Sequence, residues 1–492
     1  MSALLYQICI LLPTVAGLVI LSASFRSFRV LKWITLPAVF LTSLAILLVL
    51  LEKEPQAFVL WRFSGTLSLA FRADGLSRFF LGILAALWPM TAVYACSYMK
   101  SKQHLPLFFG FFCISYGMTA GIALADNLFT MYVFYELLSL STVGLVLQPF
   151  TKGAVSAAKT YLVYMLGGAA FGFAAMLFLL VNGAGISFTP GGSLLSHPGN
   201  PDITFLFYLF GFFGFGVKAA VFPFYAWLPK ASVAPTPVTA LLHAVAVVKA
   251  GAFAIMRLTY YCFSPALLSG SWAQHVAMLF AAFTIFFGAS KAVKELHFKR
   301  RLVFSTVANL SYILFALTLM TPAGLTAGLL HMAAHACIKI LAFFCAGSAL
   351  EHSGAVLLKD LDGLGKKMPV TFACFTCAAL SLTGIPPFNG FVSKWYILTA
   401  AAKEGSSFAY VGAGLLIVAA LLTAIYMLSA VRRAWFPEKG FQNSILSSAH
   451  EADPYMLVPM ILLAVATLVL GIFSQDILSA AESIAMEVTG TL

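Results

Sequence analysis

Charged side chains are scarce in this sequence. Asp, Glu, Lys and Arg together make up only 9% of the 492 residues, whereas 61% are hydrophobic. The mean hydropathy is +0.96, and a soluble protein of this length would need a far larger charged surface. Apolar runs of the length that crosses a bilayer, about 20 residues, follow one another almost from end to end. The composition excludes a soluble protein and indicates a polytopic helical membrane protein.

Cysteine is also sparse, and the positions of the eight cysteines exclude a disulfide framework, because they are scattered and nearly all lie inside apolar runs. Cys374 and Cys377 have CxxC spacing, but they fall within a hydrophobic segment, where a packing role is favoured. No glycine-rich nucleotide loop follows a strand, and no cysteine cluster lies outside the apolar runs. We therefore expect no cofactor in this chain.

Fourteen apolar segments are predicted to span the membrane as helices. The first could pass for a signal peptide, but no basic residue precedes it, no convincing cleavage site is present, and a second span follows at once. We expect it to remain as a mature helix. The predicted segments are 3–22, 29–51, 76–98, 106–125, 127–148, 158–182, 203–229, 237–262, 272–290, 302–320, 323–350, 369–400, 407–431 and 455–474.

Basic residues predict the orientation of these spans. The net charge of +12 is concentrated in short loops after odd-numbered spans, so it indicates an insertion signal rather than a nucleic-acid surface. We expect these loops to be cytoplasmic and both termini external, in the inner (cytoplasmic) membrane of a prokaryote. The cytoplasmic set is Arg26, Arg29, Lys32, Lys100, Lys102, Lys152, Lys159, Lys230, Lys291, Lys294, Lys299, Arg300, Arg301, Lys359, Lys366, Lys367, Arg432, Arg433 and Lys439. The external set is Lys53, Arg62, Arg72, Arg78, Arg257 and Lys403.

Five ionisable residues stand deep inside apolar segments: Glu136, Lys218, Lys249, Lys339 and Lys394. Each would cost about 3 kcal/mol at the bilayer centre, so they must face protein or water. Glu136 is the one acid in a span and requires a partner cation. The pair could simply fix helix register, but we favour a switchable pair that changes the proton affinity of a neighbour, because buried ion pairs add little net stability.

Two of the lysines belong to segments that should break. Pro223 follows Lys218 and should free a backbone carbonyl near Ala219, and Pro386 and Pro387 precede Lys394. The two breaks are about five spans apart, which predicts inverted five-helix repeats, with two unrelated kinks as the alternative. The expected parts are a three-helix segment (1–105), a first repeat (106–262, spans 4–8), a second repeat (263–432, spans 9–13) and a loop with span 14 (433–492).

Histidines accompany the lysines. His331, His335 and Lys339 recur every four residues and should form one polar stripe on a helix, whereas a regular helix would turn His243 and Lys249 to different faces. A zinc site and satisfied core histidines are possible readings of the stripe, but a hydrated proton route is favoured. Loss of hydration shifts an amine towards its neutral form, whereas a guanidinium stays charged. A line of buried Lys and His can therefore take up and release protons.

Six motifs in this region carry a family resemblance: residues 135–141 (YELLSLS), 216–229 (GVKAAVFPFYAWLP), 234–244 (APTPVTALLHA), 299–306 (KRRLVFST), 331–339 (HMAAHACIK) and 384–391 (GIPPFNGF). They resemble the antiporter-like subunits of respiratory complex I, Mrp-type cation/proton antiporters and membrane-bound hydrogenases, and most closely the M, N and Mrp D types. The resemblance implies broken seventh and twelfth helices and a hydrophilic axis parallel to the membrane plane.

The resemblance also implies a role for each residue. Glu136 would be the pairing glutamate, Lys218 the half-channel lysine, and Lys394 the terminal lysine. Lys249 and Lys339 would connect these two ends, with His243, His331 and His335 as polar positions on the axis. It further implies that any iron–sulfur cluster, flavin or nickel–iron centre belongs to partner subunits, which would include further antiporter-like subunits.

Three functions are compatible with these features. The first is a proton-translocating subunit of a redox-driven complex, either complex I-like or hydrogenase-like. The second is the D-type subunit of an Mrp sodium/proton antiporter. The third is a non-pumping scaffold, which would gain nothing by keeping five costly charges in the bilayer. A sodium site within this chain is disfavoured, since only one carboxylate is buried in a span.

Overall fold

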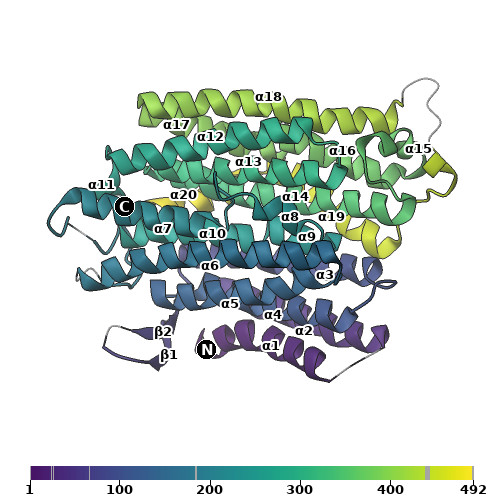
Figure 1. Cartoon of the computed structure of the whole chain (residues 1–492). Helices are drawn as coiled ribbons and strands as arrows, with labels where there is room; N and C mark the ends of the chain where they lie inside the picture. Colours follow the sequence, from purple (N-terminus) through teal and green to yellow (C-terminus); the bar gives the residue numbers. More distant parts are fainter. Residues whose placement is uncertain are drawn as a thin grey trace.

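The chain folds into a bundle of roughly parallel helices (Figure 1). The computed structural model describes residues 2–23, 25, 27–65, 67–182, 185–194, 196–437 and 444–489. Two of the predicted orientation signals, Arg26 and Lys439, lie outside these ranges. In the described part, twelve helical spans are long and apolar enough to cross a membrane. The chain is therefore a polytopic helical membrane protein.

Each predicted segment contains a helix. The uninterrupted ones are α1 (Ser2–Ser22), α2 (Phe28–Leu51), α3 (Gly75–Tyr98), α4 (Leu105–Leu124), α5 (Leu128–Leu147), α6 (Lys152–Val181), α12 (Trp272–Lys294), α13 (Phe298–Thr318), α14 (Pro322–Ser353), α18 (Ser407–Trp435) and α19 (Pro454–Ile472). Short elements lie between them: α11 (Pro265–Leu268), η2 (Leu358–Leu361), α15 (Leu364–Lys367) and η3 (Ser444–Ser447). The number of fourteen spans and the inverted repeat stay predictions.

The two predicted helix breaks are confirmed. In the seventh segment α7 (Pro201–Gly216) ends before Lys218, and helix resumes only at α8 (Trp227–Ala231). In the twelfth, α16 (Pro369–Thr383) and α17 (Asn389–Glu404) flank the two prolines. The first break starts earlier than the predicted release near Ala219, because the carbonyl of Val217 already leaves the helical pattern and accepts from Trp227 Nε1 at 2.8 Å.

A further interruption in the eighth segment was not predicted. Here α9 (Thr236–Ala244) and α10 (Val247–Arg257) are separated at Val245 and Ala246, and α10 passes into a π-helical turn, η1 (Leu258–Cys262). The regular helix assumed for His243 and Lys249 is therefore wrong. The break separates these two residues onto different helices.

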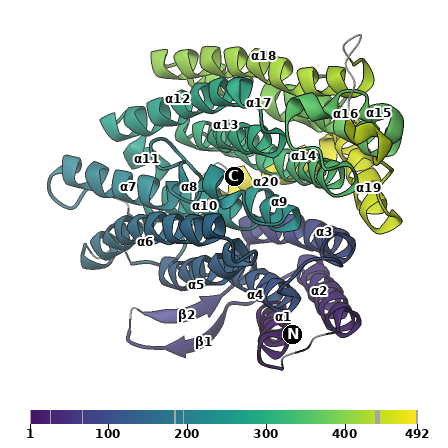
Figure 2. The same ribbon diagram turned by 45° about the vertical axis from the view of Figure 1, so that its right-hand side comes forward.

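Fully buried helices occupy the middle of the bundle. The span formed by α9, α10 and η1 is buried completely, and α13 and α14 nearly so, whereas α1, α2, α18 and α19 present rows of exposed Leu and Val. Figure 2 shows α9, α10, α13 and α14 between the outer helices. Polar side chains on these inner helices are consequently shielded from lipid.

The two ends of the bundle differ. An antiparallel hairpin of β1 (Phe58–Arg62) and β2 (Ser68–Phe71) lies at one end with α11, and α15 lies at the other (Figure 1). We call these the hairpin end and the basic end, and the charge pattern predicts that they are external and cytoplasmic. A final amphipathic helix, α20 (Gln475–Thr489), packs on α14. Neither the hairpin nor α20 was predicted from the sequence.

Candidate functional site: a buried series of lysines and histidines

Lys218 lies directly after the end of α7 and is buried, with 1% of its surface exposed. Its Nζ donates to the carbonyl of Tyr135 on α5 and lies 3.1 Å from the centre of that ring. Gly251 of α10 packs against the base of Lys218, where a larger residue would meet its Cβ and the backbone of Ala219. The broken end of α7 is thus held between α5 and α10.

Glu136 is half-buried on α5, next to the residue that binds Lys218. Within the part of the chain that the structure describes, the two side chains form no direct ion pair, and Glu136 Oε1 has no hydrogen-bond partner. Their charges nevertheless interact through space. Lys218 is therefore the expected cation near Glu136, but in this structure the two side chains are not in contact.

Lys249, His335 and His331 are in contact in the middle of the bundle. Lys249 on α10 is fully buried, and its Nζ is hydrogen-bonded to Nδ1 of His335 on α14. The rings of His335 and His331 stack with centroids 5.9 Å apart. His331 Nδ1 continues the series to Ser393 Oγ on α17 at 2.9 Å. The predicted stripe on α14 thus connects the first half of the chain to the second.

Lys394 closes the series at the break between α16 and α17. Its Nζ donates to the carbonyls of Leu382 (2.6 Å) and Thr383 (3.1 Å), which belong to the last turn of α16. The C-terminal end of a helix carries partial negative charge and favours a cation. Tyr312 of α13 bridges back, since its ring lies 5.3 Å from that of His331 and 5.4 Å from Lys394 Nζ.

Lys339 and His243 lie beside this series. Lys339 Nζ donates to the Leu302 carbonyl at 3.0 Å and to Ser305 Oγ, both on α13. His243 is fully buried against Phe343, and neither ring nitrogen has a hydrogen-bond partner within the described residues. Such an imidazole is costly unless water reaches it. The charges of Lys249 and Lys339 both act on it through space.

The predicted residues therefore form two groups. Lys249, His335 and His331 follow one another through direct contacts, and the ring of Tyr312 lies between His331 and Lys394. Glu136 and Lys218 lie apart from this series, and Gly251 of α10 packs against Lys218.

Pro223, Pro386 and Pro387 stand at the breaks, and the bonds before Pro223 and Pro387 are cis. These prolines are exposed at the surface of the bundle, whereas Lys218 and Lys394 beside the breaks are buried in protein. The freed carbonyls of Val217, Leu382 and Thr383 accept hydrogen bonds from side chains of the protein, as backbone at membrane depth requires.

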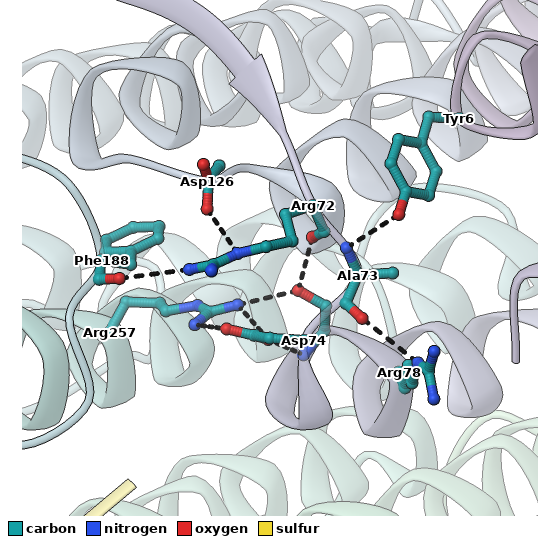
Figure 3. Close-up of polar contacts among 9 residues, drawn as sticks. Tyr6, Arg72, Ala73, Asp74, Arg78, Asp126, Phe188 and Arg257 are labelled. Atoms are coloured by element: carbon teal, nitrogen blue, oxygen red, sulfur yellow. Dashed lines mark hydrogen bonds and ion pairs between the residues drawn. The ribbon is translucent and has the colours of Figure 1, made fainter. Parts of the chain in front are cut away.

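A charged cluster near the hairpin end was not predicted as a site (Figure 3). Arg257, expected as an external loop residue, is instead fully buried at the end of α10. Its guanidinium makes a bidentate pair with Asp74, at 2.5 and 2.7 Å, and donates to Ser77 Oγ at 2.8 Å. Beside it, Arg72 pairs with Asp126 at 2.7 Å. The sequence could have indicated that Arg257 is buried, because position 257 falls inside the predicted span 237–262.

The two carboxyl groups of this cluster respond differently to their surroundings. Burial alone would raise the pKa of Asp74, but the Arg257 guanidinium and the Ser77 donors hold that pKa below its ordinary value. For Asp126, burial outweighs the attraction of Arg72, and its pKa is raised. Asp74 is thus an ionised partner that fastens α3 to α10. Among the described residues, three or more His, Cys, Asp or Glu side chains nowhere gather as a metal site would require.

Comparisons with known proteins agree in placing the chain among membrane subunits. A family model described as NADH:quinone oxidoreductase/Mrp antiporter, TM, matches residues 125–423. The chain is 31% identical over 410 residues to NADH-quinone oxidoreductase subunit N of Desulforudis audaxviator, with 81% of each chain covered. It is 31% identical over 427 residues to Na(+)/H(+) antiporter subunit A1 of Staphylococcus haemolyticus, where 81% of this chain spans about half (52%) of the relative.

Solved structures share the fold over the whole chain. A chain of the archaeal membrane-bound sulfane sulfur reductase superposes with a TM-score of 0.87 at 23% identity, covering 100% of this chain and 99% of that one. A chain of respiratory complex I from Thermus thermophilus gives 0.82 at 24% identity, with 99% and 100% covered. One from the Mrp complex of Dietzia sp. gives 0.85 at 21% identity, with 99% and 98% covered.

Proposed function

We propose that this chain, which belongs to the NADH:quinone oxidoreductase/Mrp antiporter family of membrane subunits, moves protons along its buried lysines and histidines. The observation that carries the proposal is the contact series from Lys249 through His335 and His331 to Lys394. Every member can hold or release a proton. Lys249 and His335 are hydrogen-bonded directly, and water would connect the other members of the series.

The surroundings of the lysines suit this task. A fully buried ammonium without an acidic partner is destabilised, so its neutral form becomes accessible. The carbonyl oxygens around Lys339 and Lys394 stabilise the charged form in turn. The two forms are thereby brought closer in free energy, which is what a proton relay needs. An arginine could not serve, because it stays charged.

Glu136 and Lys218 would control the relay. When the carboxylate approaches, Lys218 is held in its charged form, and when it withdraws, the buried amine gives up its proton to the series. The separated arrangement in this structure corresponds to the second condition. Each cycle of approach and withdrawal would then move one proton.

The energy for this movement would come from partner subunits. We place the chain in the inner (cytoplasmic) membrane, in a redox-driven complex of the complex I or membrane-bound hydrogenase kind. The match to antiporter subunit A1 supports a second candidate, an Mrp-type sodium/proton antiporter subunit driven by the proton motive force. The two differ in whether transport needs an electron donor or a sodium gradient.

The test is transport by the intact complex in sealed vesicles, followed with a pH-sensitive dye. Lys218→Ala and Glu136→Ala should each reduce proton movement at least about tenfold, whereas Lys152→Ala, which removes an exposed lysine, should have no effect. Pumping that is unchanged in both axis variants would refute the proposal. Transport that follows an imposed sodium gradient, with no electron donor, would select the antiporter candidate.

A further inference from the structure

A cavity of about 770 Å³ opens at the basic end of the bundle, apart from the buried series. It lies where the loop after α3, the loop after α5, the end of α8, the start of α13 and the end of α14 meet. Its volume falls in the range of small-molecule sites. The charge pattern predicts these basic residues as insertion signals, and Lys299 and Arg300 also belong to the motif at 299–306.

The lining of this cavity is strongly biased towards positive charge. Lys102, His104, Lys230, His297, Lys299 and Arg300 all line it, and among the described residues no acidic side chain does. Two of the cations are neutralised from outside the lining: Lys102 pairs with Glu351 at 2.6 Å, and Arg300 with Glu295 at 3.3 Å. The remaining two lysines, Lys230 and Lys299, have no acidic partner among the described residues.

These two lysines have only neutral partners. Lys299 Nζ donates to the carbonyl of Ala234 at 2.6 Å, and Lys230 Nζ lies 3.4 Å from Thr160 Oγ1. The pKa of the nearby His297 is lowered, first by burial and then by the positive charges of Arg300 and Lys299. An anion would be attracted here, because it would stabilise the charged forms of Lys230 and Lys299, which both line one partly enclosed space.

The remaining walls are mostly apolar, with Gln103, Gln148 and Ser232 as neutral polar members. Tyr98, Phe298 and Leu350 form the interior, and Val233 and Val356 stand exposed at the rim. Basic groups above apolar walls suit a molecule with an anionic head and an apolar body. Basic pockets between spans on the cytoplasmic side are known to hold acidic lipid headgroups.

We propose that this cavity binds a phosphate-bearing anion through Lys230 and Lys299. The phosphate could belong to an acidic phospholipid or be free in solution, since both present the same oxygens. Bound phosphate would replace the carbonyl and hydroxyl partners of the two lysines with charge-assisted hydrogen bonds. This assignment does not depend on proton movement along the buried series.

Native mass spectrometry of the full chain in detergent tests the proposal. The probes are phosphatidylglycerol, phosphatidylcholine as the neutral reference, and inorganic phosphate by calorimetry. The test variant is Lys230→Gln/Lys299→Gln, and the matched control is Lys152→Gln/Lys359→Gln, which removes two exposed lysines that are absent from the cavity lining.

Loss of phosphatidylglycerol or phosphate binding in the test variant, with binding kept in the control variant, supports the proposal. A drop of about tenfold or more in phosphatidylglycerol retention identifies a lipid, and the same drop for inorganic phosphate identifies a free ion. Equal losses in both double variants, or no binding of either probe by the unaltered chain, would overturn it. Lys230→Glu alone, at the exposed rim, gives the same discrimination if the double variant fails to fold.

Discussion

The buried lysines are bound by neutral acceptors. Lys218 donates to a carbonyl of α5, Lys339 to one of α13, and Lys394 to two of α16, while Lys249 contacts an imidazole. None of these acceptors carries a full negative charge, so each lysine can lose its proton without leaving an unpaired anion behind. This distinguishes them from Arg257, whose partner Asp74 is ionised and holds it permanently.

Ser393 is the hydroxyl that joins His331 to the segment carrying Lys394. Ser393→Ala should lower proton transport several-fold, by roughly 3- to 10-fold, because the histidine loses its contact towards Lys394. The Tm of the complex should hardly change. Ser393→Thr keeps the hydroxyl and should restore transport, and a Thr variant as impaired as the Ala variant would show that Ser393 only fills space.

Asp74 should be a stability residue rather than a transport residue. Asp74→Asn removes the charge that balances buried Arg257, and breaking such a pair costs about 3–5 kcal/mol. A thermal unfolding scan should therefore show a lower Tm. Asp476→Asn, at an exposed position of α20, is the matched control and should leave the Tm unchanged.

Acid should weaken the ion pair between Asp74 and Arg257. The pKa of Asp74 is lower in the folded protein than in the unfolded chain, so its contribution is complete above the unfolded pKa of about 4 and is lost as the pH falls through the folded value. The Tm difference between the unaltered chain and Asp74→Asn should hence be constant near neutral pH and shrink below about pH 4. A difference that grows on acidification would contradict this assignment.

The interruptions in the helices position the buried lysines against their hydrogen-bond acceptors. The break between α16 and α17 exposes the carbonyls of Leu382 and Thr383 to Lys394, and the end of α7 places Lys218 against α5. The Val245–Ala246 break separates His243 from Lys249. Interrupted helices at membrane depth are tolerated because neighbouring helices satisfy the freed backbone groups.

The Gly390→Ala substitution tests the role of the break between α16 and α17. A Cβ at this position would collide with the carbonyl of Ser381, so Gly390→Ala should push α17 away from α16 and cost about 1–3 kcal/mol. Lys394 would move from its acceptors, and transport should fall together with the Tm. Gly414→Ala on α18, where nothing lies within 4 Å, is the control. An unaffected Gly390→Ala complex would show that this close packing is dispensable.

The sequence could predict the two breaks at proline because proline removes a backbone donor and, in both segments, glycines accompany it. A single proline does not suffice, since α1, α2, α3 and α19 each continue through one. It could also predict the stripe on α14, because the spacing of His331 and His335 matches one helix face. The Val245–Ala246 break has neither Pro nor Gly at those two positions, so the local sequence gives no sign of it. Arg257 was assigned to a loop because the positive-inside rule counts charges by side and does not ask which of them find a buried partner.

Across the whole molecule the series runs transverse to the helices. Helix α5 contacts α10, α10 contacts α13, α13 contacts α14, and α14 contacts α17. The helices that carry the polar residues thus follow one another through the bundle, and Figure 2 shows their arrangement. Such a path lies along the membrane rather than across it. Glu136 is half-buried at one end, which leaves it accessible to a neighbouring subunit.

Replacement of Lys249 by arginine tests the central claim most directly. Lys249→Arg keeps a positive charge beside His335 but removes the ability to release a proton. We predict that the intact complex, reconstituted in vesicles, assembles with this variant and yet translocates protons at least about tenfold more slowly than the unaltered complex. Proton translocation at the unaltered rate in Lys249→Arg would show that a fixed charge suffices and would contradict the relay.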